Sequence, residues 1–273
     1  MKIVTLLEND TCNKELSSAH GLSLYIETET KKILFDLGPN KNFMKNAKKL
    51  DVDLSKVDIL VISHGHNDHG TGLKQFLKYN KKVQVYVSKR IFEDHVKFKN
   101  NRYLDIGIGK EPKSDRINYI YREKREIAPG IHICDMVEYA KQEIGDEGLM
   151  IYDEGHYMND HFHHEIYLII EESKKNVLFT GCSHKGIENI VASIEKSNKK
   201  EFTHIFGGLH LSHYDSFNFK ETDYLIKLGT ILPHKGKTNV YAGHCTGEDA
   251  FFELKKHMKD NLHRIKTGSI VEI

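Results

Sequence analysis

Runs of apolar residues alternate with helical patterns along most of the chain. The segments 2–7, 22–28 and 31–38 are rich in Ile, Val, Leu and aromatic residues, as is typical of β-strands. The segment 57–63 is an almost continuous apolar run, which indicates a buried strand. Since no helical pattern separates the first three runs, the chain is predicted to begin with a hairpin-rich sheet.

Helical spacing of apolar residues marks the segments 40–50 and 71–80. Asn40 stands at the start of the first segment and is a candidate N-cap. The second segment lies between the buried run 57–63 and another strand-like segment, 82–88. This part of the chain therefore predicts a strand, helix, strand unit.

The second half of the chain repeats this rhythm. Its predicted strands are 165–172, 176–184, 203–210, 238–244 and 268–273. Its predicted helices are 186–197, 221–229 and 247–258. Strands and helices thus alternate in two similar halves, which predicts an α/β (α+β) fold. A four-layered αββα sandwich fits better than a doubly wound sheet, because the first 40 residues hold strands without crossover helices.

The segment 89–164 has dense charge, scattered aromatic residues and few clean periods. Strands are predicted only near 117–121 and 131–134. We interpret the segment as an insertion over the functional site that acts as a lid.

Composition predicts one globular domain over residues 1–273. Hydrophobic residues make up 39% of the chain and charged residues 29%, and 20 glycines stand against 4 prolines. Such a chain can bury a core and has no signature of disorder. We therefore expect a single domain that includes the lid-like insertion.

The charge balance argues against a polyanionic partner. Forty Lys and Arg residues against 39 Asp and Glu residues leave a formal charge of +1, which gives no general attraction to nucleic acid. No apolar stretch approaches the roughly 18 residues of a membrane span, and no signal-peptide pattern is found. We expect a cytoplasmic protein with a small-molecule substrate and neither a nucleic-acid nor a membrane partner. The sequence does not indicate an oligomeric state.

The cysteines lie far apart, at Cys12, Cys134, Cys182 and Cys245. Without a CxxC pair they argue against a structural zinc knuckle and against a disulfide scaffold. Reduced thiols are expected. Cys182 and Cys245 each stand beside histidine and glycine, which sets them apart from the other two.

The sequence SHGHNDHG at residues 63–70 concentrates metal-type ligands after the buried run. His64, His66, Asp68 and His69 have a spacing that places nitrogen and oxygen ligands on both sides of one tight turn. Gly65 and Gly70 allow the backbone to turn tightly. The alternative is a histidine-rich exposed loop that traps metal only by chance.

Several motifs carry a resemblance to a known family across essentially the whole chain. SHGHNDHG after an apolar strand, ILFDLG before it, and FTGCSH and YAGH far downstream resemble the metallo-β-lactamase superfamily. ENDT, HGLSLYIET, GCSHKGIENI, GGLHL and HCTG are similar to a prokaryotic branch of dihydropterin-aminobenzene phosphate synthase-like proteins.

The resemblance implies an αββα fold with a dinuclear metal cleft at the sheet edges. It implies two divalent metal ions, with zinc favoured and manganese or iron as alternatives. His64 and His66 would bind the first ion, and Asp68, His69 and His244 the second. For His244 the alternative is a packed core histidine.

Cys182 departs from the family pattern, in which most members have a bridging aspartate at this position. A thiolate is an acceptable zinc ligand, and one lactamase subclass places a cysteine here, but the bridging carboxylate is lost. The alternative is a small buried residue at a strand end.

The third ligand of the first ion has two candidates. The family spacing before the bridging position points to His163, with His161 and His164 also available nearby. His184, two residues past Cys182, is the rival, and the resemblance to the branch favours it.

Further residues are candidates for the surroundings of the metals, and among them Asp36 is assigned by the resemblance. Asp36 would support the ligand turn from behind, or else serve only as a turn-forming residue. His210 and His20 would line the cleft and contact substrate, or be structural. Positive charge for a phosphate would come from Lys185, Lys89, Arg90 or Arg102, or else these side chains are simply solvated.

The predicted function is a metal-dependent hydrolase of the phosphodiesterase or esterase type. Metal-bound hydroxide would attack a phosphoester or another ester of a small metabolite, and Asp68 would orient the water or pass on its proton. One alternative is a synthase of the pterin-phosphate type that uses the same cleft. A non-catalytic ligand-binding module is another alternative, which Cys182 in place of the bridging aspartate favours. A dioxygenase with one iron is a further alternative.

Overall fold

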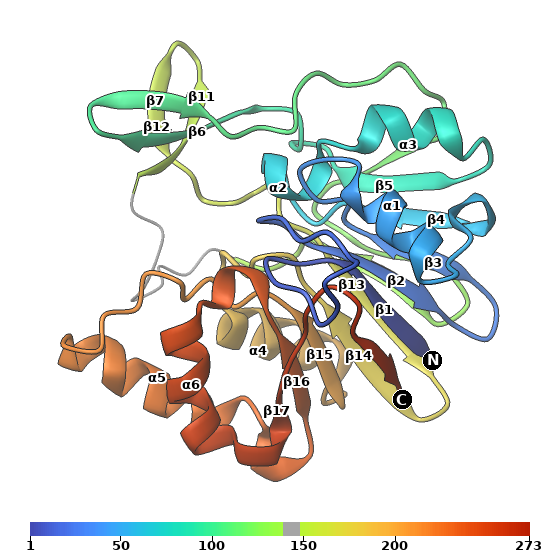
Figure 1. Cartoon of the computed structure of the whole chain (residues 1–273). Helices are drawn as coiled ribbons and strands as arrows, with labels where there is room; N and C mark the ends of the chain where they lie inside the picture. The colour runs from blue at the N-terminus through green and yellow to red at the C-terminus, as the bar shows by residue number, and fades with distance from the viewer. Residues whose placement is uncertain (139–147) are drawn as a thin grey trace. The chain divides into compact units, whose positions relative to one another are not determined.

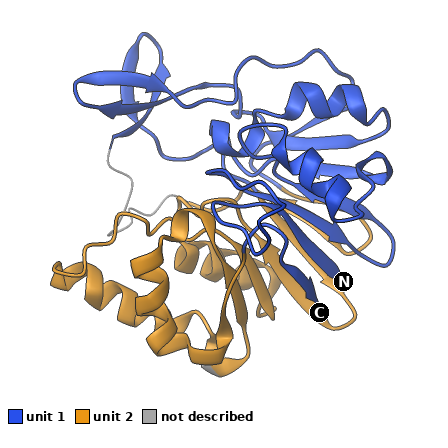
Figure 2. Cartoon of the chain, in the orientation of Figure 1, with its two compact units in different colours: residues 1–123, 148–166, 266–273 blue, residues 124–147, 167–265 orange. Residues whose placement is uncertain are grey.

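The computed structural model describes residues 1–138 and 148–273 (Figure 1). The chain divides into two compact units (Figure 2). Unit 1 comprises residues 1–123, 148–166 and 266–273. Unit 2 comprises residues 124–147 and 167–265. Each unit is built on a seven-stranded sheet.

The sheet of unit 1 has the strand order β18-β1-β2-β3-β4-β5-β8. Its strands are β1 (Lys2–Leu7), β2 (Ser23–Glu27), β3 (Lys32–Phe35), β4 (Ile59–Val61), β5 (Gln84–Ser88), β8 (Ile117–Ile120) and β18 (Ile270–Glu272). The strands β18, β1, β2 and β3 pair antiparallel, as the predicted hairpin-rich start requires. The strands β3, β4, β5 and β8 pair parallel.

Helices connect the parallel strands of unit 1 and cover one face of their sheet. They are α1 (Asn42–Lys49) and α3 (Leu73–Tyr79), with the short elements η1 (Leu54–Lys56) and α2 (Asn67–Gly70). Phe43 of α1 and Phe76 of α3 pack with Leu34, Leu60 and Val85 of the strands in one buried cluster. The helical spacing of apolar residues thus gives each helix an apolar face, and this face covers the sheet.

The start of α1 differs from the prediction. The N-cap is Lys41, and no side chain caps the helix. Asn40 instead accepts a hydrogen bond from the backbone of Asn42 at 2.8 Å. An asparagine two residues before a free backbone N–H accepts a hydrogen bond from it in an Asx turn. The prediction therefore placed the N-cap one residue too early.

Four further strands of unit 1 form a small antiparallel sheet in the order β12-β11-β6-β7 (Figure 1). They are β6 (Asp94–Lys99), β7 (Arg102–Asp105), β11 (Leu149–Asp153) and β12 (His156–Asn159). The sequence did not predict these strands. Every residue of β7 and β12 is exposed, so no alternation of apolar and polar residues marks them.

The sheet of unit 2 has the strand order β17-β16-β15-β14-β13-β10-β9. Its strands are β9 (Lys124–Ala128), β10 (Ile131–Cys134), β13 (Tyr167–Glu172), β14 (Lys175–Phe179), β15 (His204–Gly207), β16 (Asn239–Ala242) and β17 (Leu262–Arg264). The strands β14 to β17 pair parallel, and β9, β10, β13 and β14 pair antiparallel. The segment 89–164 therefore supplies strands to three sheets: the small sheet, β8 of unit 1, and β9 and β10 of unit 2.

Three helices pack on the sheet of unit 2: α4 (Ile187–Asn198), α5 (Phe219–Ile231) and α6 (Glu248–Met258). Short turns η2 (His234–Gly236), η3 (His244–Thr246) and η4 (Lys259–Asn261) complete the unit. Ile190, Leu225 and Leu254 from the helices join Ile205 and Val240 from the strands in one buried cluster. The predicted arrangement of strands and helices in two similar halves is confirmed.

None of the helices in the described part of the chain combines the length and hydropathy that a membrane span requires.

Candidate metal centre

The ligand turn of unit 1 follows strand β4 and is tied to the end of strand β3. The two strands are parallel neighbours, so their carboxyl ends meet at one edge of the sheet. Asp36 is fully buried there. It accepts hydrogen bonds from the backbone N–H and the hydroxyl of Ser63 and from Nδ1 of His69, each at 2.7 Å. Its carboxylate therefore fixes both ends of the turn.

His64 and His66 present two ring nitrogens to the same point. Nε2 of His64 lies 3.1 Å from Nδ1 of His66, and both side chains are buried. Ser63 Oγ, 2.9 Å from Nδ1 of His64, orients the first ring. Zinc binds imidazole nitrogen at about 2.0 to 2.1 Å, which places two tetrahedral ligands roughly 3.4 Å apart. The nitrogen pair fits one divalent ion.

Asp68 and His69 lie in the single helical turn α2. The Nδ1–H of His69 is held by Asp36, which leaves its Nε2 as the ligand atom, 3.6 Å from Oδ2 of Asp68. His20, whose side chain is 69% exposed, places Nε2 at 3.4 Å from the same carboxylate oxygen. Unit 1 thus brings together the predicted residues His20, Asp36 and the whole ligand turn.

A buried network that the sequence did not reveal supports the turn. His164 Nδ1 accepts the backbone N–H of Gly65 at 2.8 Å, and its Nε2 donates to Asp160 at 3.0 Å. His95 Nδ1 lies 3.3 Å from the same oxygen of Asp160. His66, His95, Asp160 and His164 are all buried and present ligand atoms within 4.8 Å of one another.

Asp160 remains ionised in this network. Burial alone would raise its pKa, but electrostatic attraction to His164 and His95 and hydrogen bonds with both rings hold the pKa well below its usual range. His164, one of the alternatives for the third ligand of the first ion, contacts the backbone of the ligand turn, and its role as a ligand stays a prediction. His95 and Asp160 had no sequence signal, because 65 positions separate them.

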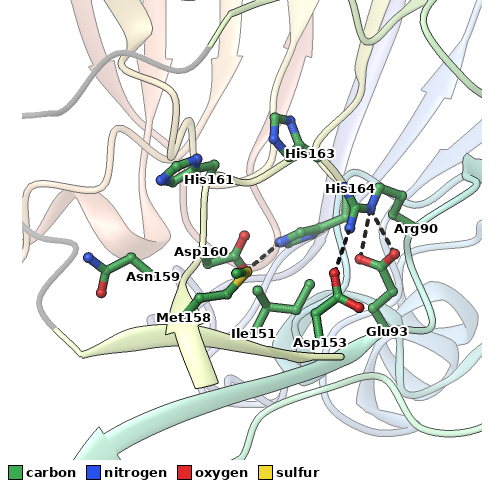
Figure 3. Close-up of a pocket in the computed structure, with 10 residues that line it drawn as sticks. All are labelled: Arg90, Glu93, Ile151, Asp153, Met158, Asn159, Asp160, His161, His163 and His164. Carbon is green, nitrogen blue, oxygen red and sulfur yellow. Dashed lines mark hydrogen bonds and ion pairs between the residues drawn. The ribbon is translucent and has the colours of Figure 1, made fainter. Parts of the chain in front are cut away.

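A cavity of about 370 Å³ opens beside this network in unit 1 (Figure 3). Its lining residues are Arg90, Glu93, Ile151, Asp153, Met158, Asn159, Asp160, His161, His163 and His164. Arg90 Nε donates to both carboxylate oxygens of Glu93, at 2.7 and 3.0 Å, and its guanidinium lies 3.9 Å from Asp153. The charge of Arg90, expected to serve a phosphate, is already matched by two carboxylates.

In unit 2 the predicted site residues lie just beyond three parallel strands. Cys182 and His184 follow β14, His210 follows β15, and His244 follows β16. All four are buried. The rings of His184 and His210 lie 4.1 Å apart between centroids. His210, at φ 51°, and His244, at φ 52°, both adopt left-handed backbone conformations that are uncommon for residues other than glycine.

Cys245 joins this group, although the sequence analysis assigned it no ligand role. Its Sγ accepts the backbone N–H of His210 at 3.3 Å and lies 3.6 Å from the carbonyl of Cys182. Cys182, His210 and Cys245 present ligand atoms within 4.8 Å of one another. The sequence signal for a ligand role of Cys245 was its position next to His244 in HCTG.

Lys185, predicted to contact a phosphate, is a buried side chain in unit 2. Its Nζ donates a hydrogen bond to the carbonyl of Val137 at 2.8 Å. The ammonium group therefore contributes to holding the segment after β10.

A mixed α/β fold with a histidine- and aspartate-rich turn at the end of a parallel strand defines a class of metal-binding enzymes. Residues 19–244 match the Metallo-beta-lactamase superfamily, and the chain belongs to this superfamily. The resemblance predicted from the motifs is confirmed.

Two relatives from Methanocaldococcus jannaschii match nearly the whole chain. One is named 7,8-dihydropterin-6-methyl-4-(β-D-ribofuranosyl)-aminobenzene-5'-phosphate synthase, with 29% identity over 290 residues that cover 100% of this chain and 96% of the relative. The other is an uncharacterised protein with 29% identity, covering 93% of this chain and 94% of the relative. The similarity to the predicted branch is therefore also confirmed.

Solved structures show the same fold. Tm1679, described as a metal-dependent hydrolase of the β-lactamase superfamily, superposes with a TM-score of 0.79 at 24% identity, covering 100% of this chain and 99% of that one. YhfI from Bacillus subtilis, a metallo-β-lactamase fold protein, has a TM-score of 0.58 at 12% identity, covering 100% and 98%. These likenesses confirm the predicted fold class.

Proposed function

We propose that the chain is a metal-dependent hydrolase that cleaves a phosphoester or another ester of a small metabolite. The observation that carries the proposal is the ligand turn of unit 1, with His64 Nε2 and His66 Nδ1 3.1 Å apart and Asp68 beside His69. Imidazole nitrogens and a carboxylate are a donor set that zinc, manganese and iron accept.

The proposed ligands are His64, His66, Asp68, His69, Cys182, His184 and His244. The part from unit 1 is supported by the geometry of the turn, and the part from unit 2 by the family resemblance. We propose two divalent ions, with zinc favoured because a thiolate is among the ligands.

Divalent ions held by this set would lower the pKa of water and stabilise the negative charge that develops on the substrate. Asp36 keeps His69 in the tautomer that presents Nε2, since it accepts the proton on Nδ1. Asp68 is placed to accept a proton from the attacking water. His20, 3.4 Å from Asp68 and largely exposed, provides a route for that proton to solvent.

Hydrolysis of p-nitrophenyl esters tests the proposal. Protein loaded with zinc or manganese should hydrolyse bis(p-nitrophenyl) phosphate or p-nitrophenyl acetate faster than the free ion does. Asp68→Asn should lower kcat by about 10²-fold or more, because the proton acceptor is lost. Asp51→Asn, a change at an exposed aspartate of the same unit, should leave kcat unchanged.

Metal content must accompany the assay. Elemental mass spectrometry should find close to two ions per chain, and fewer in Asp68→Ala. Fully loaded protein that hydrolyses neither ester would overturn the hydrolase proposal. A single iron per chain would favour the dioxygenase alternative.

A synthase is the second candidate, and it rests on the 29% identity to the M. jannaschii synthase over the whole chain. The product in the name of that relative joins a dihydropterin, through its 6-methyl carbon, to a ribofuranosyl-aminobenzene phosphate. Incubation of this protein with the aminobenzene phosphate and a dihydropterin that carries a leaving group on that carbon tests the candidate. Formation of the coupled product, detected by mass spectrometry and absent with Asp68→Asn, would favour the synthase over the hydrolase.

A further inference from the structure

We propose that Cys182, His210 and Cys245 form a thiolate-rich site for one soft divalent ion. The site lies wholly within unit 2. It goes beyond the proposed function, in which Cys182 is the single sulfur ligand and Cys245 has no part.

The topology of unit 2 brings the three residues together. Strands β14, β15 and β16 are adjacent and parallel, with Phe179 opposite Phe206 and Phe206 opposite Tyr241. The chain leaves each strand at the same edge of the sheet and places one ligand residue within four positions of the strand end. Three neighbouring strands thus deliver two sulfurs and one imidazole to one place.

The three side chains are close and shielded from water. Their ligand atoms lie within 4.8 Å of one another, and the residues are 3%, 8% and 5% exposed for Cys182, His210 and Cys245. Zinc binds sulfur at about 2.3 Å and nitrogen at about 2.0 to 2.1 Å, so tetrahedral ligands lie roughly 3.5 Å apart. Small side-chain rotations therefore suffice to bind an ion. Two cysteines and a histidine are also a set that leaves a fourth position open for water or substrate.

The backbone around Cys245 provides room for its sulfur. A Cβ atom at Gly208 would lie 2.4 Å from that Sγ, so only glycine allows the sulfur to sit there. The next ligand residue, His210, holds a left-handed conformation at φ 51°. Such conformations cost about 1 to 3 kcal/mol and persist where the surroundings enforce them.

The ligand atoms around its sulfur distinguish Cys245 from Cys134, because Cys182 and His210 present theirs within 4.8 Å of it. The backbone N–H of His210 points at its Sγ from 3.3 Å, the kind of hydrogen bond that stabilises a metal-bound thiolate. Cys134 of the same unit is instead part of the apolar cluster of the core. Cys134 is therefore the matched control for a buried cysteine without a ligand role.

Cobalt(II) tests the inference, because each thiolate ligand adds a charge-transfer band in the near ultraviolet. The full chain is used, reduced and free of metal, with His64, His66 and His69 changed to Gln so that the ligand turn of unit 1 does not bind. One equivalent of Co²⁺ should produce a band with the intensity of two thiolates.

Cysteine variants in this background separate the two proposals. Cys245→Ser should lower the charge-transfer intensity to about half, and Cys182→Ser should do the same, whereas Cys134→Ser should leave it unchanged. If Cys182→Ser abolishes the band and Cys245→Ser leaves it intact, the inference is overturned while the proposed role of Cys182 in the metal centre stands. A protein that binds no Co²⁺ in this background also overturns the inference.

A measurement without cysteine substitutions avoids the misfolding that such substitutions can cause. The same histidine-substituted chain, loaded with one equivalent of zinc, is examined by X-ray absorption at the zinc edge. Two sulfur neighbours at about 2.3 Å are expected. One sulfur neighbour or none would contradict the inference. The proposed hydrolase function does not depend on this result, because hydrolysis is measured with the unsubstituted protein.

Discussion

At the scale of single residues, buried hydrogen bonds decide which atoms are available as ligands. Asp36 accepts three hydrogen bonds at the end of β3, and one of them fixes the tautomer of His69. The role of Asp36 as a support for the metal centre, which the resemblance implied, stays a prediction that can be tested directly.

Asp36→Asn should weaken metal binding and lower stability. The amide keeps the shape but replaces one acceptor oxygen by a donor, so either Ser63 or His69 loses its partner. Loss of such a supporting contact costs about 10- to 100-fold in metal affinity, and the unpaired buried group costs about 1 to 3 kcal/mol. Competition with a chelator and urea unfolding measure the two effects. Equal affinity in this variant and in Asp51→Asn would contradict the assigned role.

A second residue-scale prediction concerns acid stability. Burial, together with the positive charges of Lys175 and His263, lowers the pKa of His204 in β15 from 6.5 to about 4. Between these values the unfolded chain binds a proton at His204 and the folded chain does not. The free energy of unfolding should therefore fall as the pH drops from 6.5 to 4, by at most about 3 kcal/mol.

His204→Gln removes this titration. Urea unfolding at a series of pH values from 7 to 4 should give a flatter dependence for the variant than for the parent. The same change at exposed His156 provides the control. Identical slopes for His204→Gln and the parent would show that the proton is not excluded from the folded state.

At the scale of elements, the close approach of parallel strands sets the geometry of the ligand loops in unit 2. Gly207, the last residue of β15, has φ 150°, and a Cβ there would lie 2.1 Å from the carbonyl oxygen of Thr180. The loops that hold Cys182 and His210 therefore start from two backbones in direct contact. This packing requires glycine at position 207.

Gly207→Ala should destabilise the protein by about 3 kcal/mol or more, because the added methyl group meets backbone that cannot rotate away. Gly155→Ala is a matched control: its φ is 89°, and a Cβ there has no atom within 4 Å. Its cost should be only the conformational strain, about 1 to 2 kcal/mol. Chemical denaturation measures both. Similar losses for the two variants would mean that the strand contact is looser than described.

At the scale of the whole molecule, neither compact unit is one continuous stretch of chain. The chain leaves unit 1 after Glu123 and after Ile166, and it returns at Gly148 and at Lys266. The last strand pairs with the first, with Lys2 opposite Glu272. Unit 1 is therefore complete only when its last strand, β18, has paired with β1. Unit 2 is likewise not one uninterrupted segment.

The prediction of a single domain over 1–273 implies one cooperative unfolding transition. Calorimetry of metal-free protein should show one transition, with equal calorimetric and van't Hoff enthalpies of about 190 kcal/mol near 60 °C. Two resolved transitions would show that the units unfold independently, and the prediction of one domain would be wrong.

Most strands, the helices that cover them and the ligand turn after β4 could be predicted from the sequence. These features depend on local patterns: apolar periodicity sets a strand or a helix, and the spacing of four ligands within residues 63–70 sets a turn. The motif also carried the superfamily, which the match over residues 19–244 confirmed.

Tertiary structure decided what depends on contacts between distant residues. His95 and Asp160 meet across 65 positions, and the donor His210 and the acceptor Cys245 across 35. The exposed strands of the small sheet have no apolar alternation. Such contacts depend on strand order and backbone pairing, which the pattern of a single segment does not encode. Only the folded chain therefore brings Cys245 to Cys182 and His164 to the ligand turn.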